Sequence, residues 1–349
     1  MLVTVSTVKD TLPNIERFVR GNLAGGADHL FVFLDDDVPD VEEFLHAHPH
    51  VTCVRTDDAW WRGERPTKLN ARQRVNANTL RVLLRGVEGV EWLFHIDADE
   101  SIQVDRAVLD AVPAELRVVR LAPLEAVSRR SWDEDPTWFK HPLDSDDLTL
   151  LHTLGVLDRP HNADYFHGHL HGKSGVRPAL DIWLTLHQGV DQDRKRLPSF
   201  EHESLRLLHY ESFSCEEFVR KWTALLSAGP VAGFRPAREP TAVALRTLLA
   251  KGLAEDQLAP FLMRIFERTT EDDFDTLHGL GLLTEVDPRQ GTHQPASLPG
   301  REQVEELLTR VAPEPKWVFG PGEPVSAASE VLSRVLEPGM LKARRYGSP

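Results

Sequence analysis

The sequence has 349 residues, with 54 Asp and Glu against 40 Lys and Arg, and a formal net charge of −14. This acidic balance argues against a general nucleic-acid-binding protein, which needs a basic surface to neutralise phosphates. Hydrophobic residues make up 41% and charged residues 27%, as is typical of a globular protein with an ample core.

The cysteines and the lengths of the apolar runs bear on the cellular compartment of the protein. Cys53 and Cys215 are too few and too far apart for a disulfide framework, so we expect two small buried side chains in a reducing environment. No apolar run approaches the roughly 18 residues of a membrane span. The first residues, MLVTVSTVKD, lack the pattern of a secretory signal. We therefore expect a cytoplasmic protein without nucleic-acid partners, for which peripheral membrane contact stays open.

The first 125 residues alternate between strand-like and helix-like patterns. Short apolar or β-branched runs predict strands at residues 1–8, 29–34, 50–56, 91–97 and 115–124. Amphipathic runs predict helices at residues 12–23 and 67–87, the second with Thr67 as its N-cap. This alternation is typical of an α/β fold with a Rossmann-like, doubly wound and mostly parallel sheet.

The rest of the chain has a different character. Residues 125–211 are irregular, with few periodic segments. Two helical stretches follow at residues 214–229 and 240–269, then a linker at 288–299, a short helix at 301–312 and a loose Pro/Gly-rich tail.

Two of the predicted strands end in acidic clusters. The run FLDDD ends at Asp37, and the run HIDAD contains Asp97 and Asp99. Ligands of open parallel sheets bind outside the carboxyl ends of the strands. Two carboxylates one residue apart can hold a hard cation that bridges the phosphates of a nucleotide. The alternative is that they begin a solvated loop, with Asp99 or Ser101 capping the next helix.

These runs resemble the GT-A glycosyltransferases of families 2 and 92. The resemblance lies in VTVSTV followed by Lys9, in GGADHLFVFLDDDVPD, in the strand end HIDADES, and then in GKSGVRP, LHQG and LRLLHYESFSCEEFVRKW, in the same order. It covers residues 1–225. KDT replaces K-N-E, DDDVPD replaces D-N-x-S-x-D, and Ser101 replaces a phenylalanine after D-x-D-E.

The resemblance implies a domain organisation and an activity. Residues 1–225 would form a GT-A domain, with a nucleotide-binding half at 1–125 and an acceptor-side half at 126–225. Residues 226–287 would be a helical C-terminal region, and residues 288–349 a linker, short helix and tail. The activity implied is that of a metal-dependent hexosyltransferase in glycan biosynthesis. It would move a sugar from a nucleoside-diphosphate donor to a hydroxyl of a saccharide or other small acceptor, with inversion.

The resemblance also assigns roles to residues. Asp35 and Asp37 would contact the base or ribose of the donor, and Lys173 and Arg177 its diphosphate. Asp97 and Asp99 would bind Mn²⁺ or Mg²⁺, with His187 and His209 as candidates to complete the site; neutral imidazole suits Mn²⁺ better. Lys68 and Arg72, early in the helix before the D-x-D strand, could also supply positive charge beside the diphosphate, but we expect them to be solvated surface residues.

The catalytic base is less specified. In an inverting transfer a carboxylate takes the proton of the acceptor hydroxyl. Glu125 is the best placed by its order along the chain, and Asp181 is a second candidate. Asp133, Glu134 and Asp135 are rivals that the sequence does not rank.

Two other readings remain. On a strand, His167, His169 and His171 would face one way and could hold zinc in a hydrolase. We expect them instead at a strand edge lining the acceptor cleft, beside Tyr165 and Phe166. Alternatively, the departures KDT and DDDVPD permit a glycosyltransferase-like scaffold without catalysis.

Overall fold

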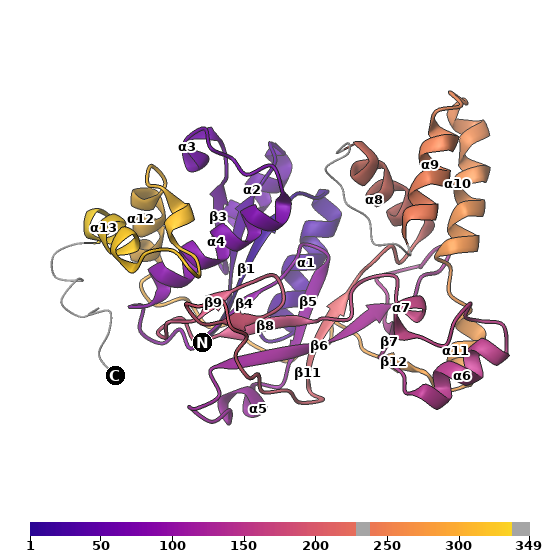
Figure 1. Ribbon diagram of the computed structural model, residues 1–349, viewed down its shortest axis with the longest axis horizontal. Coiled ribbons are helices and arrows are strands. Elements are labelled where there is room, and N and C mark those ends of the chain that lie inside the picture. Colours follow the sequence, from indigo (N-terminus) through magenta and orange to yellow (C-terminus); the bar gives the residue numbers. More distant parts are fainter. Residues whose placement is uncertain (228–237, 337–349) are drawn as a thin grey trace. The chain divides into compact units, whose positions relative to one another are not determined.

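The computed structural model describes residues 1–227 and 238–336 and divides into two compact units (Figure 1). The first unit contains residues 1–122 and 171–207 and the described residues from 288 onward. The second contains residues 123–170 and the described part of 208–287. Strands β6 (Val118–Ala126) and β11 (Leu205–His209) each continue from one unit into the other. The units therefore interleave along the sequence, whereas the predicted domains were continuous segments.

The first unit is built on a mixed sheet with the strand order β6-β8-β4-β1-β2-β3. The bounds are β1 Leu2–Val8, β2 His29–Leu34, β3 Val51–Arg55, β4 Trp92–His95 and β8 Lys173–Val176. The neighbours β4, β1, β2 and β3 are parallel, and β8 is antiparallel to both β4 and β6. The predicted α/β fold with a largely parallel sheet is confirmed at this level.

Helices connect the parallel strands. They are α1 Leu12–Ala24, α2 Pro39–Ala47, α3 Asp58–Trp61 and α4 Leu69–Leu84. Helix α1 buries Ile15, Phe18 and Val19, as its amphipathic pattern predicts. Helix α4 begins after Lys68, which makes no side-chain cap bond, so the prediction of Thr67 as N-cap was wrong. Pro66 biases the backbone just upstream toward extended conformations, which does not specify where the helix then begins.

Strand β5 (Glu100–Val104) follows directly after the Asp97–Asp99 motif, so Asp99 and Ser101 do not cap a helix. Asn22 of α1 holds this strand: its Nδ2 donates to the Glu100 carbonyl at 3.0 Å, and its Oδ1 accepts from the Ile102 N–H at 3.0 Å. A Cβ at Gly25 would lie 1.8 Å from the Ile102 oxygen. Close backbone approach therefore requires glycine here.

The first unit is completed by short elements and by the C-terminal helices. These are α5 Arg106–Asp110, β9 Trp183–Leu184, β10 Gly189–Val190, α12 Arg301–Val311, a 3₁₀ helix at Lys316–Val318, and α13 Val325–Val335. The predicted short helix is α12. Helix α13 lies where a loose tail was predicted; its buried face of Ala328, Val331, Leu332 and Val335 explains why it forms.

The second unit combines short strands with helices. Its elements are β7 Trp138–Lys140, α6 Ser145–Thr153, α7 Asn162–Tyr165, α8 Cys215–Ser227, α9 Glu239–Leu249, α10 Glu255–Thr269, α11 Phe274–Gly279 and β12 Leu283–Glu285. Strand β7 pairs antiparallel with β6 and with β12. The predicted helical stretch 240–269 is two helices, since Gly252 between them has a left-handed φ of 64°.

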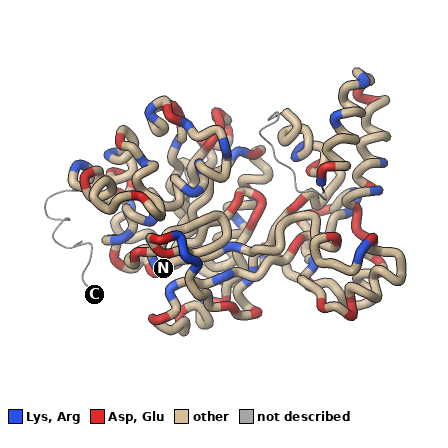
Figure 2. The backbone as a smooth tube through the Cα atoms, viewed as in Figure 1, with Lys and Arg blue, Asp and Glu red and all other residues tan. Residues whose placement is uncertain are grey.

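The distribution of charged residues and the hydropathy of the helices are those expected from the composition. Figure 2 shows Lys and Arg interspersed with Asp and Glu along the described chain. Within the described ranges, no helix is long and apolar enough to cross a membrane. Cys53 and Cys215 are free thiols, as predicted, but both are half-buried rather than buried.

Candidate functional site

The strand order of the first unit specifies where a ligand would bind. Moving outward from β1, the chain adds β2 and β3 on one side and β4 on the other, so the order reverses between β1 and β4. In open α/β sheets this switch point, at the carboxyl ends of the strands, is where ligands bind. Lys9, Asp35 and Asp97 follow the carboxyl ends of β1, β2 and β4.

Asp35 is held by two arginines. Its side chain is only 1% exposed, and its Oδ2 accepts from Arg72 Nε at 2.8 Å while its Oδ1 lies 2.9 Å from Arg65 Nη2. Thr56 Oγ1 also donates to Oδ1 at 3.1 Å. The Arg72 side chain is 11% exposed, so the expectation that it is a solvated surface residue was wrong. It extends from the first turn of α4 to the end of β2.

Asp97 lies in a second charged cluster. Its Oδ1 accepts from Gln73 Nε2 at 2.7 Å, and its Oδ2 accepts from Lys173 Nζ at 2.6 Å. Glu100 Oε2 accepts from the Asp97 N–H at 2.8 Å and lies 3.5 Å from Lys173 Nζ. The side chains of Lys173 and Glu100 are 0% exposed, whereas Asp97 is 27% exposed. The cluster is buried from one side and reachable through Asp97.

Electrostatics keep Lys173 charged. Burial works to lower the pKa of Lys173, but the negative charges of Asp97, Glu100 and Asp99 raise it above its ordinary value. The adjacent His95 responds in the opposite way: burial, together with the Lys173 charge, lowers its pKa to about 4. The cluster thus contains an ammonium beside carboxylates and a neutral imidazole.

The antiparallel pairing of β8 with β4 explains why Lys173 meets Asp97. Leu93 pairs with Val176 and Phe94 with Gly175, so the start of β8 lies at the carboxyl end of β4. Phe94 also explains Gly175, because a Cβ there would lie 2.4 Å from its ring. The register therefore brings together two motifs that are 76 residues apart.

The same register separates two other predicted residues from this edge. Arg177, just past the far end of β8, stacks its guanidinium over Trp92 at 4.3 Å, and Trp92 begins β4. Asp181 is 49% exposed and pairs with Arg85. Arg85 follows α4 thirteen residues after Arg72, about 20 Å along the helix. Neither Arg177 nor Asp181 is brought to the Asp35–Asp97 edge.

The remaining predicted residues of the first unit lie at or near the strand ends. Asp37 is 77% exposed and pairs with Arg55 at 2.9 Å. Asp99 is half-buried in the turn before β5. His187 Nδ1 lies 2.9 Å from the Gly172 carbonyl; a carbonyl only accepts, so Nδ1 is the donor and Nε2 is the nitrogen that could serve as a metal ligand.

In the second unit, Glu125 belongs to a buried ionic network. It is 0% exposed and accepts from the His167 N–H at 2.7 Å and the Gly168 N–H at 2.5 Å. Lys140 Nζ, also 0% exposed, lies 3.1 Å from Glu125 and 2.9 Å from Asp272. Burial works to lower the pKa of Lys140, but the two carboxylates raise it. A Cβ at Gly168 would lie 2.6 Å from Glu125 Oε2, so only glycine fits.

The histidines of YFHGHLHGK do not form a strand. Residues 166–172 are bends and coil, so the expectation of three rings facing one way was wrong. His167 Nε2 lies 3.2 Å from Asp272, His169 stacks on His209 with ring centroids 5.0 Å apart, and His171 lies beside His187 at 5.3 Å. The two glycines of this segment permit the bends that a strand would not have. Each ring has a different partner.

His209, the last residue of β11, belongs to the second unit. Its Nδ1 lies 3.9 Å from Glu125 and its Nε2 lies 3.8 Å from Glu211. Glu211 is paired with Lys221 and Arg238, at 2.7 and 3.2 Å. Asp133, Glu134 and Asp135 lie in the same unit, in the segment between β6 and β7.

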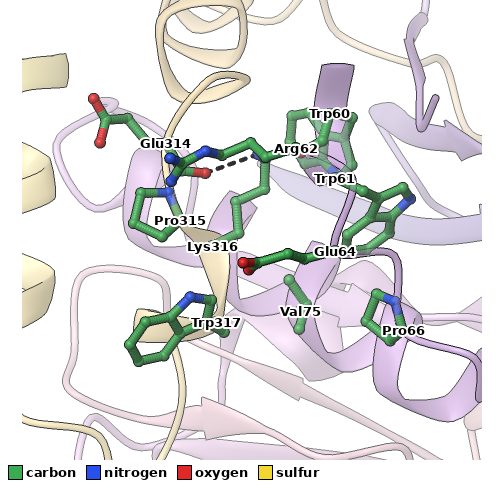
Figure 3. A pocket seen from close by; sticks show the side chains of 10 residues that line it. All are labelled: Trp60, Trp61, Arg62, Glu64, Pro66, Val75, Glu314, Pro315, Lys316 and Trp317. Atoms are coloured by element: carbon green, nitrogen blue, oxygen red, sulfur yellow. Dashed lines mark hydrogen bonds between the residues drawn. The ribbon is translucent and has the colours of Figure 1, made fainter. Parts of the chain in front are cut away.

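A separate hollow in the first unit is lined by aromatic and charged side chains (Figure 3). Lys316 dominates it: its Nζ donates to the carbonyls of Trp60, Ala312 and Glu314 at 2.5, 2.7 and 3.1 Å. Burial lowers the pKa of Lys316 to about 8. The cavity volume is about 40 Å³, which has room for a water molecule and not for a nucleotide. The lysine anchors the segment after α12 on Trp60.

Sequence reasoning missed three residues of the strand-end edge, Arg65, Gln73 and Glu100, and assigned Arg72 to the solvated surface. The available signal was position, because Arg72 and Gln73 lie near the start of the helix that leads into β4. A first turn after a parallel strand lies near the same edge of the sheet as the carboxyl ends.

Comparisons with known proteins add little. No protein-family model matches the sequence, and no curated protein matches it. Among solved structures, the apo structure of WbbM, a bifunctional glycosyltransferase, is similar over 51% of this chain and 31% of its own, with 14% identity and a TM-score of 0.24.

Proposed function

We propose that this chain is a GT-A-type glycosyltransferase that transfers a sugar from a nucleoside-diphosphate donor to a hydroxyl acceptor. One observation carries the proposal. Near the switch point of the sheet, Asp35 lies at the end of β2 and Asp97 at the end of β4. Each carboxylate is paired with a cation: Asp35 with Arg72, and Asp97 with Lys173. The order of motifs along residues 1–225 supports the same reading.

The chemistry of a donor diphosphate fits this edge. An acidic protein, with a net charge of −14, repels phosphates unless cations are placed locally. Lys173 supplies one such charge beside the strand end. If the enzyme is metal-dependent, Asp97, Asp99 and His187, all from the first unit, would hold the ion. Bound Mn²⁺ or Mg²⁺ would supply charge stabilisation for the leaving diphosphate.

The arrangement around each candidate base differs. Glu125 is sealed, with its oxygens engaged by two N–H groups and Lys140, whereas Asp181 is half-exposed and paired with Arg85. Either role requires an acceptor hydroxyl within hydrogen-bond reach. Both remain predictions, as do the acceptor-side role of residues 126–225, inversion, a saccharide acceptor and a cytoplasmic location.

A melt-shift screen tests the proposal. A ligand that binds only the folded state raises its melting temperature by mass action. We expect UDP or GDP, or one of their sugars, to stabilise the protein in the presence of Mn²⁺. No shift with any nucleotide would favour a non-catalytic scaffold. Stabilisation by Zn²⁺ alone, retained in Asp97→Ala/Asp99→Ala protein, would favour a hydrolase built on His167, His169 and His171.

A further inference from the structure

The side chains around Asp97 do not leave it as a bare metal ligand. Gln73 donates to Oδ1 at 2.7 Å and Lys173 donates to Oδ2 at 2.6 Å. Both donors come from ordered elements, since Gln73 is in α4 and Lys173 begins β8. A divalent ion needs a carboxylate lone pair at about 2.0–2.6 Å. A cation on Oδ2 would therefore have to take the place of the Lys173 ammonium or lie directly beside it.

Lys173 is also fixed more firmly than an ordinary surface lysine. Its side chain is 0% exposed, and Glu100, equally buried, lies 3.5 Å from its Nζ. An ammonium 2.6 Å from the Asp97 carboxylate places a positive charge inside the cluster. Like charges at such distances repel strongly where water is excluded.

We infer that the Lys173 ammonium is the resident cation of this strand-end site and excludes a divalent ion from Asp97. The inference deepens the proposed function and rests on it for one consequence only: a donor diphosphate would attract the ammonium away from Asp97. Metal and nucleotide would then bind together, each raising the affinity for the other by the same factor. This assigns Lys173 the control of metal dependence in addition to a contact with phosphate.

The test is a calorimetric titration of the full-length protein with Mn²⁺ alone. We expect the unmodified protein to bind Mn²⁺ no more tightly than about 1 mM, a value for weak sites. Lys173→Met removes the charge and keeps the length of the side chain, and its affinity for Mn²⁺ should rise at least tenfold. Lys195→Met, at an exposed lysine of the same unit, should leave the affinity unchanged.

A second pair of variants guards against a folding defect. Lys173→Met leaves Glu100 buried without its ammonium, whereas Glu100→Gln/Lys173→Met removes one charge of each sign. Comparing the double variant with Glu100→Gln alone should again give at least a tenfold gain. Adding Asp97→Asn to Lys173→Met should abolish the gain, because the ion would then lose its carboxylate.

The outcomes separate this inference from the proposed function. Micromolar Mn²⁺ binding by the unmodified protein, or a gain below threefold in both comparisons, overturns the inference. Repeating the titrations with UDP and GDP tests the function: if neither nucleotide binds while Lys173→Met gains Mn²⁺, the exclusion by Lys173 stands and the glycosyltransferase proposal fails. If a nucleotide binds but the variants show unchanged Mn²⁺ affinity, the glycosyltransferase proposal stands and the exclusion by Lys173 fails.

Discussion

Each unit of the molecule contains a fully buried lysine between two carboxylates. In the first unit Lys173 lies 2.6 Å from Asp97 and 3.5 Å from Glu100; in the second, Lys140 lies 3.1 Å from Glu125 and 2.9 Å from Asp272. The clusters have the same charges and nearly the same distances.

They differ in access to solvent. Asp97 is 27% exposed, whereas Glu125 is 0% and Asp272 8% exposed. Backbone groups complete the sealed cluster: Lys140 donates to the Tyr165 carbonyl at 2.8 Å. A buried ion pair that cannot exchange partners acts on structure, while a pair with one reachable member can exchange its partner for a ligand. Exposure of one carboxylate thus distinguishes the two clusters.

The largest expected effect compares the two lysines. Lys140→Met should destabilise the protein by about 3–5 kcal/mol, because it removes the ammonium from two sealed carboxylates. Lys173→Met should cost only about 1–3 kcal/mol, since it leaves one sealed carboxylate, Glu100, which keeps the Asp97 N–H, while Asp97 keeps Gln73 and contacts solvent. Urea unfolding of both variants measures the difference. If Lys173→Met is as destabilising as Lys140→Met, access does not distinguish the clusters.

The second prediction concerns donor binding at the reachable cluster. Asp99→Ala should abolish Mn²⁺-dependent binding of the donor nucleotide, a loss of at least about 100-fold or 2.7 kcal/mol, while the unfolding free energy stays unchanged. Asp110→Ala, at an exposed carboxylate of the same unit, is the matched control. Calorimetry with UDP, GDP and their sugars provides the measurement; unaltered affinity in Asp99→Ala would refute the metal role.

How much the sequence predicted depends on the range of the interactions. Strands β1 and β2 and helix α1 follow from local apolar patterns, and their observed bounds match the predicted ones within a residue. Strand β5 was missed because its partners are distant in the sequence: it pairs with β11, and Asn22, about 80 residues away, bonds to its backbone. Helix α13 was missed because Pro and Gly in its vicinity obscured a short buried face.

The candidate site divides in the same way. Asp35 and Asp97 could be predicted because strand ends are read from the sequence, but their partners could not. Lys173 meets Asp97 only because β8 is antiparallel to β4, and nothing local specifies that pairing. The same pairing places Arg177 away from the edge with Asp35 and Asp97, although Lys173 and Arg177 belong to the same motif, GKSGVRP.

The third prediction uses pH to probe what lies outside the lysine clusters. The pKa of both lysines is raised and that of Asp272 lowered, so these three groups keep their charges between pH 7 and 5. His29 differs in kind: burial, together with the nearby Arg301 charge, lowers its pKa to about 3. The folded state keeps His29 neutral while the unfolded chain takes up a proton below about pH 6.5.

Stability from His29 is therefore complete above pH 6.5 and falls as the pH drops toward 3. Between pH 7 and 5 the expected loss from His29 is about 2 kcal/mol. His95, whose pKa burial lowers to about 4, adds a loss of the same sign that stays in a His29 variant. Urea unfolding at several pH values measures the combined loss, and His29→Gln should flatten the profile by the part that His29 contributes. A profile equally steep in the variant would mean that other groups carry the dependence.

The smallest expected effect concerns Asp35, which pairs with one exposed arginine and one mostly buried arginine. Arg65 is 43% exposed and Arg72 only 11%, yet both contact the same buried carboxylate. Arg65→Ala should change the unfolding free energy by less than about 1 kcal/mol, as for exposed ion pairs, while Arg72→Ala should cost about 1–3 kcal/mol. Denaturant titrations of the two variants decide the order. Equal losses would show that solvent exposure of the cation does not govern the strength of a pair at this edge, and would weaken the same argument for Asp97.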